Sequence, residues 1–133
     1  ESRALSYVSH LGLGIDFTAR DIQTKCKDKG LPWEIAKGFD NSAVLGEWIP
    51  FEEVSSDRIK FRLLKNRQLV QQGDSSEMIF NFAKLIAYIS GIFSLGTGDV
   101  IFTGTPAGVG PIAVGDLLEG FIEEKRMFWT EIR

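Results

Sequence analysis

The first regular pattern along the chain is an alternation of apolar residues with glycine or aspartate. Apolar side chains recur at every second position, at Leu11, Leu13, Ile15 and Phe17. Because successive side chains of a strand point to opposite faces, this period of two predicts a β-strand. One carboxylate, Asp16, lies close to the end of that strand.

A helix is predicted immediately afterwards, from about Ala19 to Lys29. Thr18 and Asp21 stand three residues apart and resemble a capping box with aspartate in place of glutamate. Apolar residues follow at helical spacing, and Gly30 is typical of the position just after a helix. Pro32 then ends the pattern, since proline disfavours helical geometry at the residue before it.

The middle of the chain predicts a β-hairpin followed by the clearest amphipathic helix. Residues 59–64 and a second run ending near Gln72 have strand character, and the polar turn Lys65-Asn66-Arg67 joins them. Ser75 and Ser76 offer an N-cap for the helix. Its apolar residues recur at three- and four-residue steps, at Ile79, Phe82, Leu85, Ile86, Ile89 and Phe93.

The last third of the chain is rich in glycine. Five glycines between Gly96 and Gly110 predict shaped loops, with a turn at residues 96–99 and a short buried strand over Val100–Phe102. Two β-rich runs close the chain, Leu117–Ile122 and Met127–Ile132, with the turn Glu123–Arg126 between them. The expected class is therefore α+β, with strands predominating.

Composition restricts the partners that the protein is expected to have. The 133 residues suit one domain, the net charge is -3, and no long block of like charge occurs, which argues against nucleic acid and anionic membranes as partners. No apolar run approaches the roughly 20 residues of a bilayer span. The single cysteine, Cys26, excludes an internal disulfide, so a reducing cytoplasm is the default expectation.

Several common catalytic motifs are absent from the sequence. There is no Gly-x-x-x-x-Gly-Lys-Ser/Thr phosphate loop and no Gly-x-Gly-x-x-Gly dinucleotide motif. With only His10 and Cys26 as nitrogen and sulfur ligands, a zinc site is not expected. No Gly-x-Ser-x-Gly elbow surrounds a serine, and Cys26 fits a small buried hydrophobe better than a nucleophile.

Asp16 and the residues after it form the first group of candidate site residues. Asp16, at the end of a strand and before a helix, can bind a hard cation or accept backbone N–H bonds as a cap. Arg20 and Gln23 lie three residues apart on one helix face and can hold a substrate carboxylate. An ion pair of Arg20 with Asp16 or Asp21 is the structural alternative.

Lys37 and the Thr103-Gly104-Thr105-Pro106 segment are the other candidates. Lys37 has an aromatic residue on either side, Trp33 and Phe39, and a partly buried ammonium there can stabilise an enolate or a carboxylate. The alternative is an ordinary solvated lysine. Thr103 to Pro106 combines hydroxyls with a glycine that lets backbone N–H groups approach an anion, or it forms a tight structural turn.

Taken together, these segments resemble the C-terminal catalytic domain of the fumarylacetoacetate hydrolase family. The likeness is greatest to its small acylpyruvate hydrolase, oxaloacetate decarboxylase and bacterial isomerase-like members. The matching segments follow one another in order over nearly the whole chain, at residues 16–23, 30–33, 36–40, 71–73, 78–80 and 98–110.

The resemblance implies a fold and a chemistry. The fold would be a mixed β-roll, rich in strands and with two main helices. The activity would be that of a Mg²⁺- or Mn²⁺-dependent enzyme on small β-dicarbonyl 2-oxo acids such as acylpyruvates or oxaloacetate. Cleavage of a C–C bond, decarboxylation or tautomerisation would proceed through a metal-chelated enolate. Relatives are commonly homodimers, so a homodimer is expected.

Site roles follow residue by residue from the same resemblance. Asp16 is similar to a metal ligand of the family, and Lys37 to the cation that stabilises the developing enolate. Arg20 and Gln23 are similar to its substrate-positioning groups, and Thr105 to a contact with the substrate carboxylate. Lys37 would therefore serve both catalysis and substrate binding.

The chain also departs from the family pattern. A Glu-x-Glu pair of metal ligands and a lid with His and Glu lie upstream in relatives, so residues 1–133 are expected to form one catalytic-type domain that lacks both, and to be inactive by themselves. The alternative is a truncated, non-catalytic binding or assembly domain of the same fold. Relatives often have Asn-Gly where this chain has Asn66-Arg67, and a left-handed backbone would be strained at the arginine.

Overall fold

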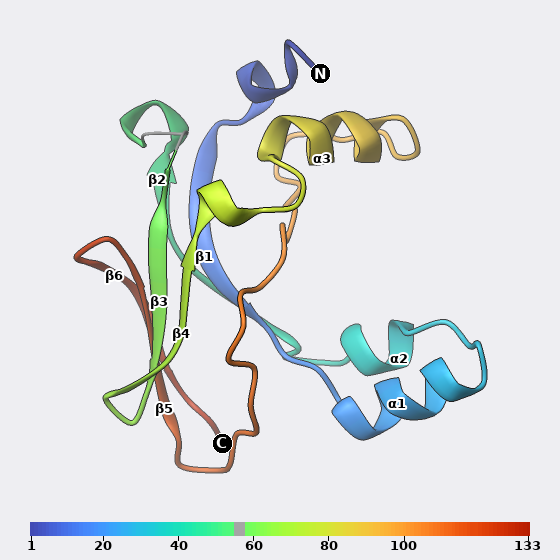
Figure 1. Cartoon of the computed structure of the whole chain (residues 1–133), viewed down its shortest axis with the longest axis vertical. Coiled ribbons are helices and arrows are strands. Elements are labelled where there is room, and N and C mark those ends of the chain that lie inside the picture. The colour runs from blue at the N-terminus through green and yellow to red at the C-terminus, as the bar shows by residue number, and fades with distance from the viewer. Residues whose placement is uncertain (55–57) are drawn as a thin grey trace. The chain divides into compact units, whose positions relative to one another are not determined.

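The structure is a computed structural model that describes residues 1–54 and 58–133 (Figure 1). The chain divides into two compact units, one made of residues 1–13 and 46–133 and the other of residues 14–45. Among the described residues, none of the helices has the length and apolar character needed to cross a bilayer.

In residues 1–54 and 58–133, six strands and three α-helices make up most of the regular structure. The strands are β1 (His10–Asp16), β2 (Ala43–Pro50), β3 (Lys60–Lys65), β4 (Gln68–Asp74), β5 (Leu117–Ile122) and β6 (Lys125–Glu131). The α-helices are α1 (Arg20–Asp28), α2 (Glu34–Lys37) and α3 (Phe82–Ser90). Three short 3-10 helices complete the list, η1 (Ala4–Tyr7), η2 (Phe51–Glu53) and η3 (Ser75–Glu77).

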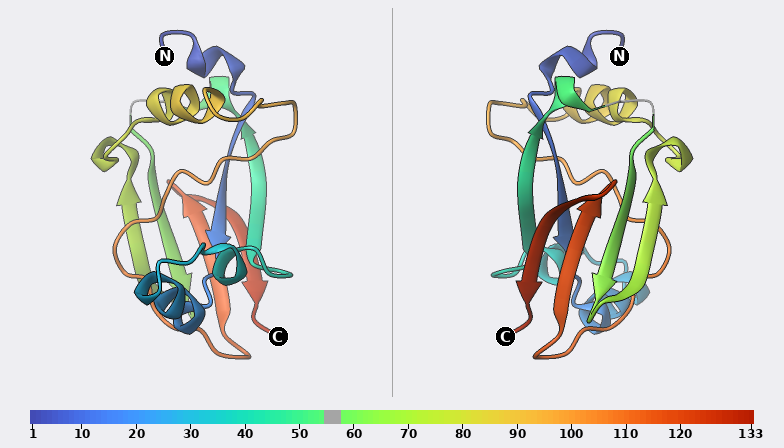
Figure 2. Two further views of the ribbon diagram at one scale, coloured as in Figure 1. Left: turned by 90° about the vertical axis from the view of Figure 1, so that its right-hand side faces the viewer. Right: turned by 90° about the vertical axis from the view of Figure 1, so that its left-hand side faces the viewer.

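Strands β4, β3, β5 and β6 form one antiparallel sheet in that order, and β1 pairs with β2 in a second sheet (Figure 2). Side chains of β5 alternate in burial, with Leu118 and Ile122 on the buried face beside Met127 and Phe128 of β6. Burial of each such side chain contributes about 1.5–3 kcal/mol. The predicted α+β class, rich in strands and with two main helices (α1 and α3), is confirmed.

Each of two hairpins in the four-stranded sheet contains a β-bulge. In β3–β4 the register skips Val70, and in β5–β6 it skips Met127. The carbonyl oxygens of these extra residues face glycines, because a Cβ on Gly108 would collide with the Val70 oxygen and one on Gly46 would lie 2.7 Å from the Met127 oxygen. The bulges thus bring the backbones of Gly108 and Gly46 close to the strands.

The predicted hairpin turn at Asn66-Arg67 is confirmed, and both residues have the left-handed backbone, with φ of 51° and 67°. Asn66 tolerates this conformation, and its side chain is fixed at both ends. Its amide donates to Asp116 Oδ1 (2.7 Å) and its oxygen accepts from the Leu117 N–H (2.9 Å). Arg67 is the residue at which the turn carries a conformational cost.

Replacing Arg67 by glycine is therefore expected to stabilise the protein by about 0.5–1 kcal/mol, because glycine adopts positive φ without a Cβ penalty. Equilibrium denaturation in urea measures the change. Arg67→Ala is the matched control: it removes the same side chain but keeps the Cβ, so its stability should stay near that of the parent. Equal stabilisation by alanine and glycine would show that the side chain, not the backbone, causes the cost.

The capping box predicted at Thr18 and Asp21 is wrong. Helix α1 begins after Ala19 with no side-chain cap bond. The Thr18 hydroxyl is engaged elsewhere, since it accepts a hydrogen bond from Lys37 Nζ at 2.8 Å. The predicted end of this helix is confirmed, because Gly30 follows it with φ of +64°.

The N-cap predicted at Ser75 and Ser76 is also wrong. These residues form η3, which Asp74 caps by accepting from the Ser76 N–H. The Ser76 hydroxyl, with Arg58, lowers the pKa of Asp74 to about 2. Helix α3 starts later, after Asn81, whose side chain accepts from the Lys84 N–H. Two residues of the predicted apolar stripe lie outside the helix, Ile79 before its start and Phe93 after its end, and they are 91% and 64% exposed.

Other differences concern short elements. No prediction covered β2 or α2. The strand predicted at Val100–Phe102 is wrong: the segment is irregular, and Val100 and Phe102 are 45% and 46% exposed. Its neighbouring glycines favour a loop over pairing with a strand. The turn between β5 and β6 takes only residues 123–124, so β6 begins at Lys125 rather than Met127. Cys26 is buried, as expected.

Candidate active site

Asp16, Thr18 and Lys37 meet within the unit of residues 14–45. Asp16 ends β1, and Lys37 is the last residue of α2 (Figure 1). Lys37 Nζ donates to Asp16 Oδ2 at 2.6 Å and to Thr18 Oγ1 at 2.8 Å. The ammonium is therefore held between a carboxylate and a hydroxyl.

Backbone hydrogen bonds bring these residues together. Ala19 N donates to Ala36 O at 3.0 Å, and Ala36 is fully buried. Helix α2 is thereby fixed against the start of α1, with which it packs. Since Lys37 follows Ala36 directly, its side chain is placed next to the end of β1. No local pattern predicts this ion pair, because the two residues are 21 positions apart in the sequence.

The ion pair decides between interpretations that the sequence left open. Asp16 binds an ammonium rather than capping α1, whose start has no side-chain cap bond. The Lys37 side chain is only 35% exposed, so it is not an ordinary solvated lysine. Asp16, at 45% exposure, uses Oδ2 for this pair. Within residues 1–54 and 58–133, Oδ1 accepts no hydrogen bond.

Arg20 and Gln23 also lie together, on the first turn of α1. Arg20 Nη1 donates to Gln23 Oε1 at 2.6 Å. Neither ion pair considered for Arg20, with Asp16 or with Asp21, forms in the part of the chain that the structure describes. The guanidinium keeps further N–H donors, and the Gln23 amide keeps its NH₂ group. The pair therefore presents several donors, as an anion-binding site requires.

Thr105 belongs to the other unit, in the loop between α3 and β5. Residues 103–106 run as an open loop, not as the tight turn considered as an alternative, and Gly104 has φ of +122°. Gln71 of β4 donates from Nε2 to Thr105 Oγ1 at 2.9 Å and to Pro106 O at 3.0 Å. The five predicted site residues thus fall into a group of four, in residues 14–45, and Thr105.

Two residues of these contacts, Thr18 and Gln71, had no predicted role in the site. Thr18 lies beyond β1, which ends at Asp16, and its only local signal pointed to a helix cap, so nothing in the sequence connected it to Lys37. Gln71 belonged to a segment that resembled the family, but nothing local in the sequence connected it to Thr105.

Asp16 fits one position in the coordination sphere of a hard divalent cation. Carboxylate oxygen is the donor that Mg²⁺ and Mn²⁺ prefer, and Mg²⁺ commonly combines one or two protein carboxylates with water. Among the described residues, no group of three or more His, Cys, Asp or Glu side chains is arranged to hold a metal ion. The described residues therefore hold no complete set of such ligands.

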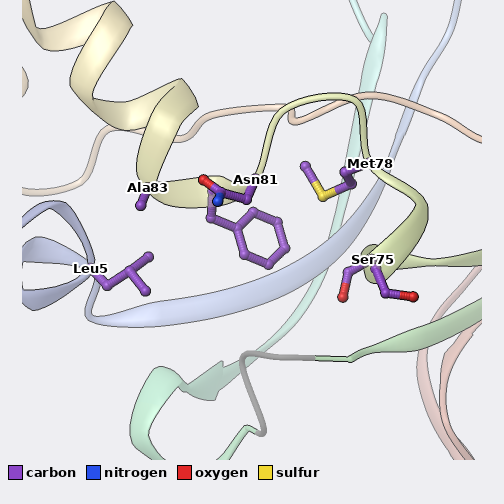
Figure 3. Close-up of a pocket in the computed structure, with 7 residues that line it drawn as sticks. Leu5, Ser75, Met78, Asn81 and Ala83 are labelled. Carbon is purple, nitrogen blue, oxygen red and sulfur yellow. The ribbon is translucent and has the colours of Figure 1, made fainter. Parts of the chain in front are cut away.

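A cavity of about 290 Å³ lies elsewhere, between η1, η3 and the start of α3 (Figure 3). Leu5, Met78 and Phe82 supply apolar walls. Two of its polar side chains already accept hydrogen bonds from the backbone: Ser75 Oγ from Ile59 N, and Asn81 Oδ1 from Lys84 N. None of the predicted site residues lines it.

Comparison with known proteins connects this arrangement to one family. Residues 1–129 match the family model described as fumarylacetoacetate (FAA) hydrolase C-terminal. The chain is 43% identical over 123 residues to the mitochondrial oxaloacetate tautomerase FAHD1 of Homo sapiens, covering 92% of this chain and 56% of that protein. It is 43% identical over 120 residues to the oxaloacetate tautomerase YcgM of Escherichia coli, covering 89% and 55%.

A solved structure agrees in fold. The crystal structure of fumarylpyruvate hydrolase from Pseudomonas aeruginosa, in complex with Mn²⁺ and pyruvate, superimposes with a TM-score of 0.93 at 32% identity. The match covers 98% of this chain and 57% of that one. The chain thus spans little more than half the length of the relatives it matches.

Proposed function

Because the chain belongs to the fumarylacetoacetate hydrolase family, we propose that it serves an enzyme that acts on small 2-oxo acids. Oxaloacetate and acylpyruvates are the proposed substrates, and the reaction is C–C bond cleavage, decarboxylation or tautomerisation. The similarity to oxaloacetate tautomerases and to a fumarylpyruvate hydrolase supports this substrate class. The observation that carries the proposal is the contact of Lys37 with Asp16 and Thr18.

In this proposal Asp16 is a ligand of Mg²⁺ or Mn²⁺. The Mn²⁺ and pyruvate in the Pseudomonas aeruginosa relative support a divalent cofactor. Such an ion, when bound, draws electron density from the oxo group of the substrate. Residues 1–133 act as one catalytic-type domain, and the other protein ligands come from outside the described residues.

The remaining site residues bind and orient the substrate. Lys37 places a positive charge where negative charge develops on the substrate oxygen, and Thr18 limits the movement of that ammonium. Arg20 and Gln23 direct N–H donors at a carboxylate. Thr105 supplies a hydroxyl contact to the substrate carboxylate. The proposed assembly is a homodimer, as inferred from the family resemblance.

Turnover by the full-length gene product tests the proposed function. The protein is stripped of metal and then mixed with oxaloacetate, with or without Mn²⁺ or Mg²⁺. The decay of the enol absorbance reports tautomerisation, and a coupled lactate dehydrogenase assay reports pyruvate released by decarboxylation. Because free divalent ions also promote these reactions of oxaloacetate, we expect one of these signals to exceed the rate of a protein-free sample only when protein and metal are both present.

An acylpyruvate in the same assay detects hydrolysis, again as pyruvate release. If neither substrate is turned over with either metal, the non-catalytic alternative, a binding or assembly domain, replaces the enzyme. A rate that does not depend on added metal would contradict the role given to Asp16.

A further inference from the structure

We propose that Gln71 is a positioning residue, which directs the hydroxyl proton of Thr105 toward the carboxylate of the bound substrate. The inference rests on the proposed function, because it takes Thr105 as a substrate contact. It begins from the two hydrogen bonds that Gln71 Nε2 donates, to Thr105 Oγ1 (2.9 Å) and to Pro106 O (3.0 Å).

The second of these bonds fixes the orientation of the Gln71 amide. A carbonyl oxygen can only accept a hydrogen bond, so the atom facing Pro106 O must be the NH₂ group. The same nitrogen lies within hydrogen-bond distance of the Thr105 hydroxyl. Both amide protons are then used, and toward Gln71 the hydroxyl can act only as an acceptor.

A threonine hydroxyl has a single proton. Since its oxygen accepts from Gln71, that proton is available to a different acceptor. Across residues 1–54 and 58–133, Thr105 donates to no protein acceptor, and the residue is exposed. A ligand that offers oxygen acceptors, above all a carboxylate, completes the arrangement, whereas a ligand that offers only donors does not.

The fold places Gln71 for this purpose through the bulge in β4. Leu63 pairs with Gln71, and Leu64 pairs with Leu69. Cross-strand partners share a face and successive residues of β3 do not, so Gln71 and Leu69 lie on opposite faces although they are two residues apart. The extra residue, Val70, therefore turns Gln71 to the face that the loop crosses.

The bulge also holds the loop at a second point. Gly108 approaches the Val70 carbonyl so closely that a Cβ would collide with it, and its φ is +100°. Two consecutive residues of β4 thus contact the loop. Gln71 bonds to Thr105 and Pro106, and Val70 lies against Gly108. Because the loop is held at residues 105–106 and again at Gly108, the Thr105 hydroxyl stays in place.

Ligand binding to variants of the full-length, Mn²⁺-loaded protein tests the inference. Gln71→Glu replaces the donor by an acceptor that captures the Thr105 proton, and Gln71→Met removes the donor. Gln72→Glu is the matched control, because it makes the same charge change at an exposed neighbouring position. Calorimetry measures the Kd of pyruvate and of its neutral methyl ester, and a melting curve reports stability.

We expect Gln71→Glu to raise the Kd of pyruvate on the order of tenfold or more, the cost of a lost hydrogen bond to a charged group. Gln71→Met should raise it about threefold, because the hydroxyl then rotates freely. The methyl ester and the Gln72→Glu control should change less than about twofold. In a Thr105→Val background, Gln71→Glu should have no further effect.

The outcomes distinguish the positioning role of Gln71 from the proposed function. If Thr105→Val weakens pyruvate binding but neither Gln71 variant does, the positioning role is wrong and the proposed function stands. A Gln71→Glu effect that persists in the Thr105→Val background, or that is equal for the ester, also overturns the role. Failure of the parent protein to bind pyruvate with Mn²⁺ would instead reject the proposed function.

Discussion

Replacing Lys37 by methionine is expected to lower kcat by about 10²–10³-fold while KM changes less than about threefold. The expected loss falls on kcat because the ammonium opposes charge that develops only in the transition state. In the resting structure the same charge is balanced by Asp16, 2.6 Å away. Methionine keeps most of the side-chain length, so helix α2 should remain in place.

Steady-state kinetics at saturating Mn²⁺ measure this change, and saturation removes any effect of the variant on metal affinity. Lys27→Met, at an exposed position in the last turn of α1, is the matched control and should behave like the parent. An unchanged kcat for Lys37→Met would reduce Lys37 to a structural partner of Asp16. A large rise in KM with constant kcat would assign it to ground-state binding instead.

The second large effect is expected at Asp16. Asp16→Asn should weaken Mn²⁺ binding by at least about 100-fold. In metal sites, loss of a residue that only hydrogen-bonds to a ligand already lowers metal affinity about 10–100-fold, and loss of the ligand's own charge should cost at least as much. Asparagine keeps the size of the side chain, and its oxygen can still accept from Lys37. The local fold should therefore survive, and a melting curve checks that it does.

Titration of the metal-free protein with Mn²⁺, followed by electron paramagnetic resonance, measures the affinity directly and without turnover. Asp21→Asn is the control, because it removes a carboxylate from an exposed position on the same unit. If Asp16→Asn binds Mn²⁺ within threefold of the parent, Asp16 is not a metal ligand. Equal losses in both variants would point to net charge rather than coordination.

The elements that the sequence predicted well are those with a local cause. The alternation before Asp16 produced β1, and the Asn66-Arg67 turn produced the β3–β4 hairpin, because period and turn chemistry act over a few residues. The N-caps failed where a neighbouring side chain competed. The Thr18 hydroxyl accepts a hydrogen bond from Lys37 instead of capping α1, and Asn81 rather than a serine caps α3.

The sequence predicted which residues belong to the candidate site better than it predicted the hydrogen bonds between them. Asp16, Arg20, Gln23, Lys37 and Thr105 followed from a family resemblance over segments of several residues. The hydrogen bond between Arg20 and Gln23 could have been predicted, since their spacing places them on one helix face. The bond of Gln71 to Thr105 was not, because it joins positions 34 apart through a bulge that leaves no mark in the pattern of apolar residues.

The skipped position in β4 sets a limit on redesign of this hairpin. Shortening β4 by one amino acid would make its ladder with β3 regular, a change that usually favours stability in designed proteins. Here deletion of Val70 would leave Gln71 opposite Leu63 but remove the carbonyl that Gly108 approaches, so a more ideal scaffold would hold the Thr105 loop less firmly and be a poorer host for the ligand. Homologues that keep the bond between Gln71 and Thr105 should therefore keep a residue at this point of the strand, where a deletion would otherwise cost the sheet nothing.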